Sequence, residues 1–199
     1  MTLMQPAPDA AALRVLMVPA LPVGLAEHID RVVVAAGALA RRHGLDERRT
    51  LLAAQAHDLL RAQPDAALLA DAEARNLDID AVERAVPVLL HGPLAALALP
   101  ERGWVTDPMV LDAVRYHTTG HPDYGPEAWA MFVADKVEPN KLARWPALQA
   151  VIELAEYSLE ASALVYLELA RAQAAREGWA IHPLAEATRQ ALHRRAVDS

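Results

Sequence analysis

The sequence of 199 residues contains no cysteine and no long apolar run. Without cysteine, neither a disulfide framework nor a thiolate metal site is available, so we expect a reducing compartment, the cytoplasm. No segment approaches the roughly 18 uninterrupted apolar residues of a membrane span, and the N-terminus lacks the charged and apolar stretches of a signal peptide. We therefore expect a soluble, cytoplasmic protein with no membrane partner.

Positive charge is also scarce. The chain has 19 Lys and Arg against 26 Asp and Glu, a formal net charge of −7. This deficit argues against broad binding to a nucleic-acid backbone. An anionic substrate must instead be attracted by a metal ion or by a few well-placed cations.

What the sequence does contain is helix-forming apolar residues, with an apolar share of 54% in which Ala and Leu dominate. This composition predicts one all-α domain, a single helical bundle. Four prolines, Pro6, Pro8, Pro19 and Pro22, interrupt the start of the chain. They predict a loose leader over residues 1–22, with one short helix near 13–18, before a domain at 23–199.

Apolar positions at helical spacing, together with stop and start signals, predict the helices of that domain. Asp107 followed by Pro108 is the strongest start signal, because Asp caps a helix and Pro suits its first turn. The expected helices cover 25–43, 46 to just before Pro64, 65–75, 81–90, 108–117, 127–137, 147–157, 159–177 and a short final segment from 183.

Several histidines and acids fall on the apolar faces of these helices. A buried carboxylate is costly unless it is paired or ligates a metal, and both "QAHDLL" and "MFVADKV" place one in an apolar run. Six side chains are therefore candidate ligands of one open site: His28, His57, Asp58, His91, His117 and Asp135.

Histidine and carboxylate ligands suit Fe, Mn, Co, Ni or Zn, and the sequence leaves open whether one or two ions bind. Water on such an ion has a strongly lowered pKa and attacks phosphorus near neutral pH. Phosphoester or phosphoanhydride hydrolysis is the expected chemistry, without a covalent nucleophile, since neither cysteine nor a G-x-S-x-G turn is present.

The order of these motifs resembles the HD superfamily and, more closely, its YqeK-type symmetrical bis(5′-nucleosyl)-tetraphosphatases. The resemblance covers roughly residues 25 to 190. Its motifs are H-x-x-R at His28 and Arg31, H-D at His57 and Asp58, "LLHGP" at His91, "RYHTTG" at Arg115 to Gly120, "FVADKVEP" at Asp135 and "IHPL" at His182.

The resemblance implies an HD-domain helical bundle that binds iron and cleaves diadenosine tetraphosphate symmetrically into two ADP. The implied metal ligands are His28, His57, Asp58 and Asp135. The implied catalytic residues are Asp58, Arg61, His91 and His117, where the last two face the phosphates or a second ion. The implied substrate contacts are Arg61, His91, His117, Thr118, Lys136, Lys141 and His182.

Three positions at the expected phosphate edge depart from the family pattern. Arg61 stands where the family usually has Lys, "EPNK" with Lys141 replaces "EPGR", and His121 replaces the Arg of "TTGRP". An Arg for a Lys keeps the charge but exchanges a point ammonium for a planar fork. The departures therefore bear on substrate preference more than on metal binding.

Three alternatives stay open. One is another HD nucleotide phosphohydrolase, acting on a nucleoside monophosphate, a deoxynucleoside triphosphate or a cyclic nucleotide. A second is a nucleotide-binding sensor without turnover. The third is a helical interaction module with a structural metal, although structural sites tend to be closed. The sequence does not fix the oligomeric state, and a homodimer is one expected assembly.

Overall fold

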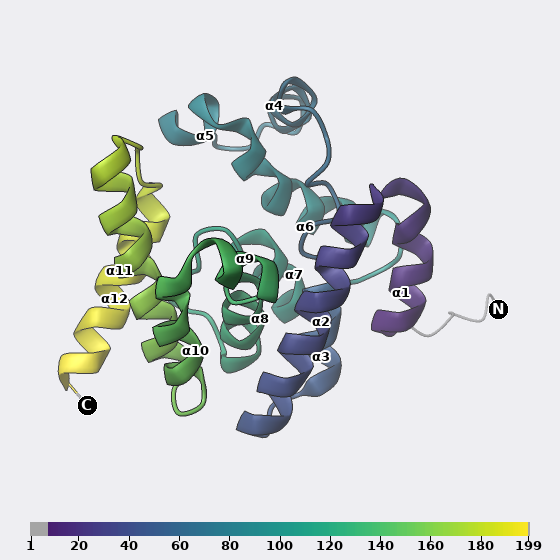
Figure 1. Cartoon of the computed structure of the whole chain (residues 1–199). Coiled ribbons are helices and arrows are strands. Elements are labelled where there is room, and N and C mark those ends of the chain that lie inside the picture. Colours follow the sequence, from purple (N-terminus) through teal and green to yellow (C-terminus); the bar gives the residue numbers. More distant parts are fainter. Residues whose placement is uncertain (1–7, 199) are drawn as a thin grey trace.

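A computed structural model describes residues 8–198, in which helices and turns account for the fold and no strand occurs (Figure 1). The all-α class is therefore confirmed. In chain order the helices are α1 Ala10–Met17, η1 Val18–Ala20, α2 Val23–His43, α3 Glu47–Ala56, α4 Asp65–Ala74, α5 Ala81–Ala85, η2 Pro87–Leu90, α6 His91–Glu101, α7 Pro108–Arg115, α8 Pro126–Lys136, α9 Pro139–Arg144, η3 Pro146–Leu148, α10 Gln149–Ala155, α11 Leu159–Glu177 and α12 Pro183–Asp198.

Local sequence signals set several of these bounds. Asp107 accepts a hydrogen bond from the Met109 amide and begins α7, and Ser158 accepts one from the Ala161 amide and begins α11. At the other end of α11, Gly178 adopts a left-handed conformation with φ of 74°. A residue with a Cβ adopts this conformation only at a cost, so a glycine ends the helix.

The centre of the fold is α8, which packs against α2, α3, α7 and α11. Every residue from 128 to 136 is buried, because neighbouring helices cover all sides of α8. Burial of a side chain such as Phe132 contributes about 1.5–3 kcal/mol. Asp135 and Lys136 lie at the end of this helix, so both charged groups are carried into the interior.

A second, smaller core lies under α4. Leu68 and Ala72 of α4 pack with Leu90 and Leu94 of η2 and α6. In Figure 1, α4 and α5 lie at the top of the molecule, apart from α8 and α10. Residues of α5 and of α11 and α12 line opposite sides of one cavity, described below.

Part of the expected leader packs on the domain. Helix α1 contacts α3, and Leu13 and Met17 are fully buried in the main core. Residues 10–20 are thus helical, over a longer stretch than the one expected near 13–18. Residues 1–7 of the expected leader lie outside the described part of the chain, and the domain boundary at 22/23 stays a prediction.

The structure corrects the sequence prediction at several helices. The helix expected to carry His57 and Asp58 inside it ends at Ala56, so both residues lie in the turn that follows. The segment 81–90 splits into α5 and η2, and α6 and α9 were not expected at all. The last helix, expected to be short, runs for 16 residues.

Candidate metal centre

The six expected ligands converge in space. They come from α2, from the turn after α3, from the start of α6, from the turn after α7 and from α8. Their nitrogen and oxygen atoms form two groups, each within 4.8 Å: His28, His57 and Asp135 in one, Asp58, His91 and His117 in the other. We call these six residues the metal centre.

Asp58 joins the two groups through its two oxygens. Its Oδ2 lies 3.6 Å from His28 Nε2 and 3.4 Å from His57 Nε2. Its Oδ1 lies 3.0 Å from His91 Nε2 and 3.5 Å from His117 Nε2. Because Asp58 is in a turn rather than inside a helix, its carboxylate reaches imidazoles on both sides.

Three of the histidines have the same backbone partner. Nδ1 of His57, His91 and His117 contacts the carbonyl oxygen three residues earlier, at 2.7 Å for His57 and 2.7 Å for His117. A carbonyl only accepts, so each Nδ1 carries the proton and each neutral Nε2 presents a lone pair to the centre. This orientation is the one that metal-binding imidazoles adopt.

The facing lone pairs require a positive charge between them. Nε2 of His91 lies 2.9 Å from Nε2 of His117, and Nε2 of His57 is buried without a hydrogen-bond partner. Acceptor atoms this close to each other and to a carboxylate repel one another unless a proton or a cation intervenes. The donor set of imidazole nitrogens and carboxylate oxygens therefore fits a divalent ion of the first transition row.

Burial and charge shift the pKa values of these groups. Loss of solvation lowers the pKa of His117 to about 4, which leaves its imidazole neutral at neutral pH. Burial opposes the charged forms of His57 and Asp58, but their mutual attraction outweighs it: the pKa of His57 is raised and that of Asp58 falls well below its usual range. The centre thus combines an ionised carboxylate at Asp58 with the neutral imidazole of His117.

Two lysines hold the second carboxylate. Lys136 Nζ donates to Asp135 Oδ2 at 2.7 Å and to the His117 carbonyl at 2.9 Å, while Lys141 Nζ lies 2.5 Å from Asp135 Oδ1. Although burial raises it, the nearby ammonium groups keep the pKa of Asp135 well below its usual range. Lys136 is itself buried, so in this arrangement its contacts are to Asp135 and His117 and not to the open side of the centre.

Glu138 is a buried acid that the sequence reasoning did not single out. It is 3% exposed, its Oε2 accepts a 2.7 Å hydrogen bond from Arg31 Nε, and its Oε1 lies 3.8 Å from His28 Nδ1. Glu138 thus places a negative charge on the Nδ1 side of His28, at a longer distance than the carbonyl hydrogen bonds of the other histidines. The signal available in the sequence was an acid three residues after Asp135, before Pro139.

A glycine lets two of the ligands meet. A Cβ placed on Gly92 would lie 2.9 Å from the Arg115 carbonyl oxygen and 3.1 Å from a ring carbon of His117. Because Gly92 lacks a side chain, the start of α6 approaches the end of α7 closely enough for His91 to reach His117. The "LLHGP" sequence therefore opens a helix at His91 and does not end one.

A cationic cavity opens onto the centre. It has a volume of 620 Å³, and His28 and Asp58 form part of its wall. Its positively charged lining residues are Arg31, Arg61, Lys141 and Arg144. Within residues 8–198, Arg61 and Arg144 have no ion-pair or hydrogen-bond partner for their side chains, so this cavity places unneutralised positive charge beside the metal centre.

Thr118 and His182 lie elsewhere, in the wall of a second, mainly apolar cavity of 450 Å³. His182 Nε2 lies 3.1 Å from Asp80 Oδ2 and 3.5 Å from Glu83 Oε1. We call this group of three residues the His182 cluster. It links the segment before α12 to α5 and contributes no atom to the metal centre.

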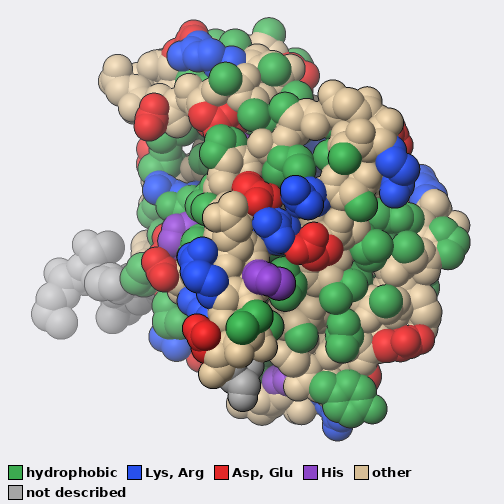
Figure 2. All heavy atoms as spheres, turned by 90° about the vertical axis from the view of Figure 1, so that its left-hand side faces the viewer, with side chains coloured by type: hydrophobic (Ala, Val, Ile, Leu, Met, Phe, Trp, Pro, Cys, Tyr) green, Lys and Arg blue, Asp and Glu red, His purple; other side chains and the backbone are tan. Residues whose placement is uncertain are grey.

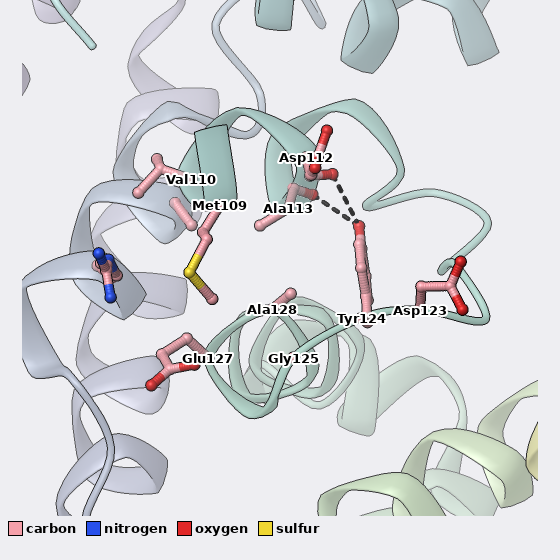
Figure 3. A pocket seen from close by; sticks show the side chains of 11 residues that line it. Met109, Val110, Asp112, Ala113, Asp123, Tyr124, Gly125, Glu127 and Ala128 are labelled. Atoms are coloured by element: carbon pink, nitrogen blue, oxygen red, sulfur yellow. Dashed lines mark hydrogen bonds between the residues drawn. The ribbon is translucent and has the colours of Figure 1, made fainter. Parts of the chain in front are cut away.

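A third cavity, of 90 Å³, lies between α7 and α8 and contains none of the expected ligands (Figure 3). Met109 and Val110 face Ala128 and Glu127 across it. The Tyr124 hydroxyl at its edge is engaged, donating to the Ala113 carbonyl at 2.8 Å. Neither its size nor its chemistry suits a phosphate substrate.

Comparison with known proteins agrees with the geometry. The family model described as HD domain matches residues 25–140 of this chain, more than half of it, and contains all six residues of the metal centre. The chain belongs to the HD domain family. It is accordingly a hydrolase, and the His and Asp cluster is the part of the HD domain that is able to hold a divalent metal.

Two curated relatives are similar to this chain over roughly two thirds of its length. Both are described as symmetrical bis(5′-nucleosyl)-tetraphosphatases. The protein of Bacillus subtilis is 31% identical over 132 residues, 66% of this chain and 69% of its own length. The protein of Halalkalibacterium halodurans is 30% identical over 125 residues, 63% of this chain and 65% of its own length.

A crystal structure from Clostridium acetobutylicum, described as a predicted HD superfamily hydrolase involved in NAD metabolism, has the same fold. The TM-score is 0.87 at 19% sequence identity, over 96% of this chain and all of the other. The likeness extends beyond residues 25–140 and so includes the C-terminal helices of this HD domain. Among residues 8–198, no helix is both long and apolar enough to cross a membrane.

Proposed function

We propose that this HD domain hydrolyses dinucleoside polyphosphates, with symmetrical cleavage of diadenosine tetraphosphate into two ADP as its reaction. The observation that carries the proposal is the cationic cavity, in which Arg61 and Arg144 lack partners within the described chain and His28 and Asp58 form the wall. A polyphosphate matches this charge. The names of the two curated relatives support the same substrate class.

In the proposed mechanism, His28, His57, Asp58 and Asp135 hold a divalent ion, with iron as the expected metal. His91 and His117, which share Asp58 with the other group, face the phosphates or complete a second ion site. When bound there, a divalent ion would supply Lewis-acid polarisation of a phosphoryl oxygen and a water of lowered pKa. The lone pairs of His57, His91 and His117 stay directed inward because their Nδ1 protons are held by the backbone.

The surrounding residues orient the substrate and balance its charge. Arg61 and Lys141 stand at the edge of the cationic cavity, where fixed cations stabilise the charge that develops on the transferring and leaving phosphates. Lys136 keeps Asp135 ionised and in place through its 2.7 Å hydrogen bond. Thr118 follows His117 and is expected to donate a hydrogen bond to a phosphate oxygen. A homodimer and a cytoplasmic location stay predictions.

The test is incubation of the purified protein with diadenosine tetraphosphate and iron, manganese, cobalt, nickel or zinc in separate reactions. Chromatography should show ADP as the sole nucleotide product, whereas ATP with AMP would indicate asymmetrical cleavage. An Asp58→Asn variant serves as the control for contaminating activity. Consumption of another nucleotide in preference, or tight binding without any product, would contradict the proposal.

A further inference from the structure

Lysine is rare in this chain, and both lysines lie at one place. Of the 19 Lys and Arg residues, only Lys136 and Lys141 are lysines. Many of the arginines pair with acids near the surface, as Arg195 does with Glu160 at 2.9 Å. On the face shown in Figure 2, blue side chains of Lys or Arg accordingly lie beside red side chains of Asp or Glu. The two lysines instead both bind the buried carboxylate of Asp135.

The two oxygens of Asp135 face different surroundings. Oδ2 accepts the 2.7 Å hydrogen bond from Lys136 Nζ. Oδ1 lies 3.3 Å from His28 Nε2 and 3.8 Å from His57 Nε2, so it is the oxygen that faces the imidazoles of the metal centre. Lys141 Nζ contacts this same Oδ1 at 2.5 Å. One lysine therefore lies behind the carboxylate, and the other lies on the side that faces the imidazoles.

Lys136 is held firmly on Oδ2. Its side chain is 8% exposed, and its ammonium group also donates to the His117 carbonyl at 2.9 Å. The ring centroids of Phe132 and Tyr166 lie 4.9 and 5.7 Å from Nζ, within the roughly 6 Å of a cation–π contact. A carboxylate, a carbonyl and two aromatic rings thus surround this ammonium group.

Lys141 has room to move. Its side chain is 39% exposed and lines the cationic cavity of 620 Å³. Besides Oδ1, its ammonium group binds the backbone carbonyl of Asp135 at 2.7 Å. A lysine ammonium is a compact charge on a flexible four-carbon stem, whereas an arginine guanidinium is a planar fork. The Lys141 side chain is therefore able to turn from Asp135 into the cavity without a movement of the backbone.

Two cations on one carboxylate oxygen repel each other, and the repulsion is strong where little water screens them. Asp135 is 4% exposed, so an ammonium group on Oδ1 opposes any divalent ion that uses the same atom. We propose that Lys141 is an exchangeable cation, which neutralises Asp135 Oδ1 and turns into the cationic cavity when a divalent ion takes that oxygen. The movement adds a positive charge where the cavity receives an anion. This inference rests on the metal centre and does not depend on which nucleotide is hydrolysed.

The first test measures the affinity of the full chain for Mn²⁺, by competition with a fluorescent chelator and without nucleotide. Lys141→Met removes the ammonium group and keeps the length of the side chain. Its Mn²⁺ affinity should rise by about 5- to 150-fold, the usual range of coupling between two sites. Lys141→Arg keeps the charge, so its affinity should stay closer to that of wild type than the affinity of Lys141→Met does.

Arg144→Met is the matched control. Arg144 lines the same cationic cavity, whereas the cations bonded to Asp135 are the two lysines. Loss of the Arg144 charge alters the field in the cavity but does not uncover Oδ1, so the Mn²⁺ affinity should change much less than in Lys141→Met. Circular dichroism and thermal unfolding establish that each variant is folded.

The second test follows the two amines in the wild-type protein. Because the chain has only two lysines, brief acetylation with acetic anhydride followed by mass spectrometry reports on each of them separately. Saturating Mn²⁺ should raise the labelling rate of Lys141 several-fold, because its amine leaves a carboxylate for an open cavity. Lys136 is the internal control, and its labelling should stay low with and without Mn²⁺.

The outcomes separate this inference from the proposed function. Equal or weaker Mn²⁺ binding in Lys141→Met than in wild type overturns the exchange, as does labelling of Lys141 that falls or stays constant when Mn²⁺ is added. An equally large effect in Arg144→Met also overturns it, because the charge of the whole cavity would then be the cause. A wild type that binds no Mn²⁺ overturns it together with the metal centre. Tighter binding specific to Lys141→Met, with faster labelling of Lys141, upholds it even if hydrolysis of diadenosine tetraphosphate fails.

Discussion

Within residues 8–198, histidine and carboxylate groups gather in the metal centre and in the His182 cluster, and the two differ in the direction of their hydrogen bonds. In each of the two groups of the metal centre, and likewise in the His182 cluster, potential ligand atoms lie within 4.8 Å of one another. Composition and distance therefore do not distinguish them. What distinguishes them is which imidazole nitrogen carries the proton.

In the metal centre, Nδ1 of His57, His91 and His117 faces a carbonyl oxygen and must donate. In the His182 cluster, Nδ1 accepts from the Leu184 amide at 3.1 Å, so the neutral ring carries its proton on Nε2 and donates it to Asp80. The first arrangement leaves lone pairs without donors, whereas the second satisfies both nitrogens. We therefore expect metal at the first and none at the second.

The largest effect is expected from Asp58→Asn, which removes the carboxylate shared by both halves of the metal centre. Loss of an outer-shell partner costs about 10- to 100-fold in metal affinity or activity, and loss of a bridging ligand should exceed this. The fold should persist, because asparagine is nearly the same size. Metal content by elemental analysis and hydrolysis of diadenosine tetraphosphate provide the measurements.

The matched control is Asp80→Asn, the same change at the carboxylate paired with His182. Because that cluster is satisfied without metal, Asp80→Asn should keep the metal content of wild type. An equal loss of metal in both variants would contradict the distinction between the two clusters.

A smaller effect is expected from Glu138→Gln. No hydrogen bond to a carbonyl holds His28 Nδ1, and the Glu138 carboxylate, fixed by Arg31 at 2.7 Å, lies 3.8 Å from it. Loss of its charge should lower metal affinity by about 10- to 100-fold, and the free energy of unfolding should change less. Titration with a competing chelator measures the affinity. Glu83→Gln, in the His182 cluster, is the control, and equal affinities in the two variants would refute an orienting role for Glu138.

Gly92→Ala should disturb the metal centre by displacing α6 from α7. The added Cβ would lie 2.9 Å from a carbonyl oxygen, and overpacking of this kind costs about 1–3 kcal/mol in the free energy of unfolding. Metal content should fall as well, because His91 moves with the helix. Gly125→Ala is the control, since its Cβ would meet Met109 at an ordinary 3.5 Å. Denaturant unfolding that showed no difference between the two variants would contradict the close-approach argument.

The sequence predicted those parts of the fold that local signals determine. The bounds of α11 were predicted correctly, because Ser158 and Gly178 mark its ends. By contrast, α6 was missed because its start, "HGP", has the composition of a turn. Pro93 is tolerated there since a helix leaves the amides of its first turn unpaired. The glycine of this motif allows a close tertiary contact with α7. No local sequence pattern indicates such a contact.

The candidate site was predictable in its ligands but not in its hydrogen bonds. Apolar runs around Asp58 and Asp135 indicated costly buried acids, and both are in the metal centre. The roles of the nitrogens depend on which backbone groups surround each ring, and Glu138 comes near His28 only because Arg31 of α2 binds it in the folded chain. For the same reason Lys136, expected at the substrate, lies against Asp135.

The smallest effect is expected at His182, where the comparison between the clusters is sharpest. His182→Ala removes the acceptor for the Leu184 amide at the start of α12, and loss of such a cap costs about 0.5–2 kcal/mol. His182→Asn should recover most of this loss, because asparagine is a good cap, although the contact to Asp80 is gone. Hydrogen exchange at Leu184 measures the local change. Metal content should equal that of wild type in both variants, since both nitrogens of His182 are engaged in hydrogen bonds and offer no free lone pair to a metal. A loss of metal would contradict the assignment of the His182 proton to Nε2.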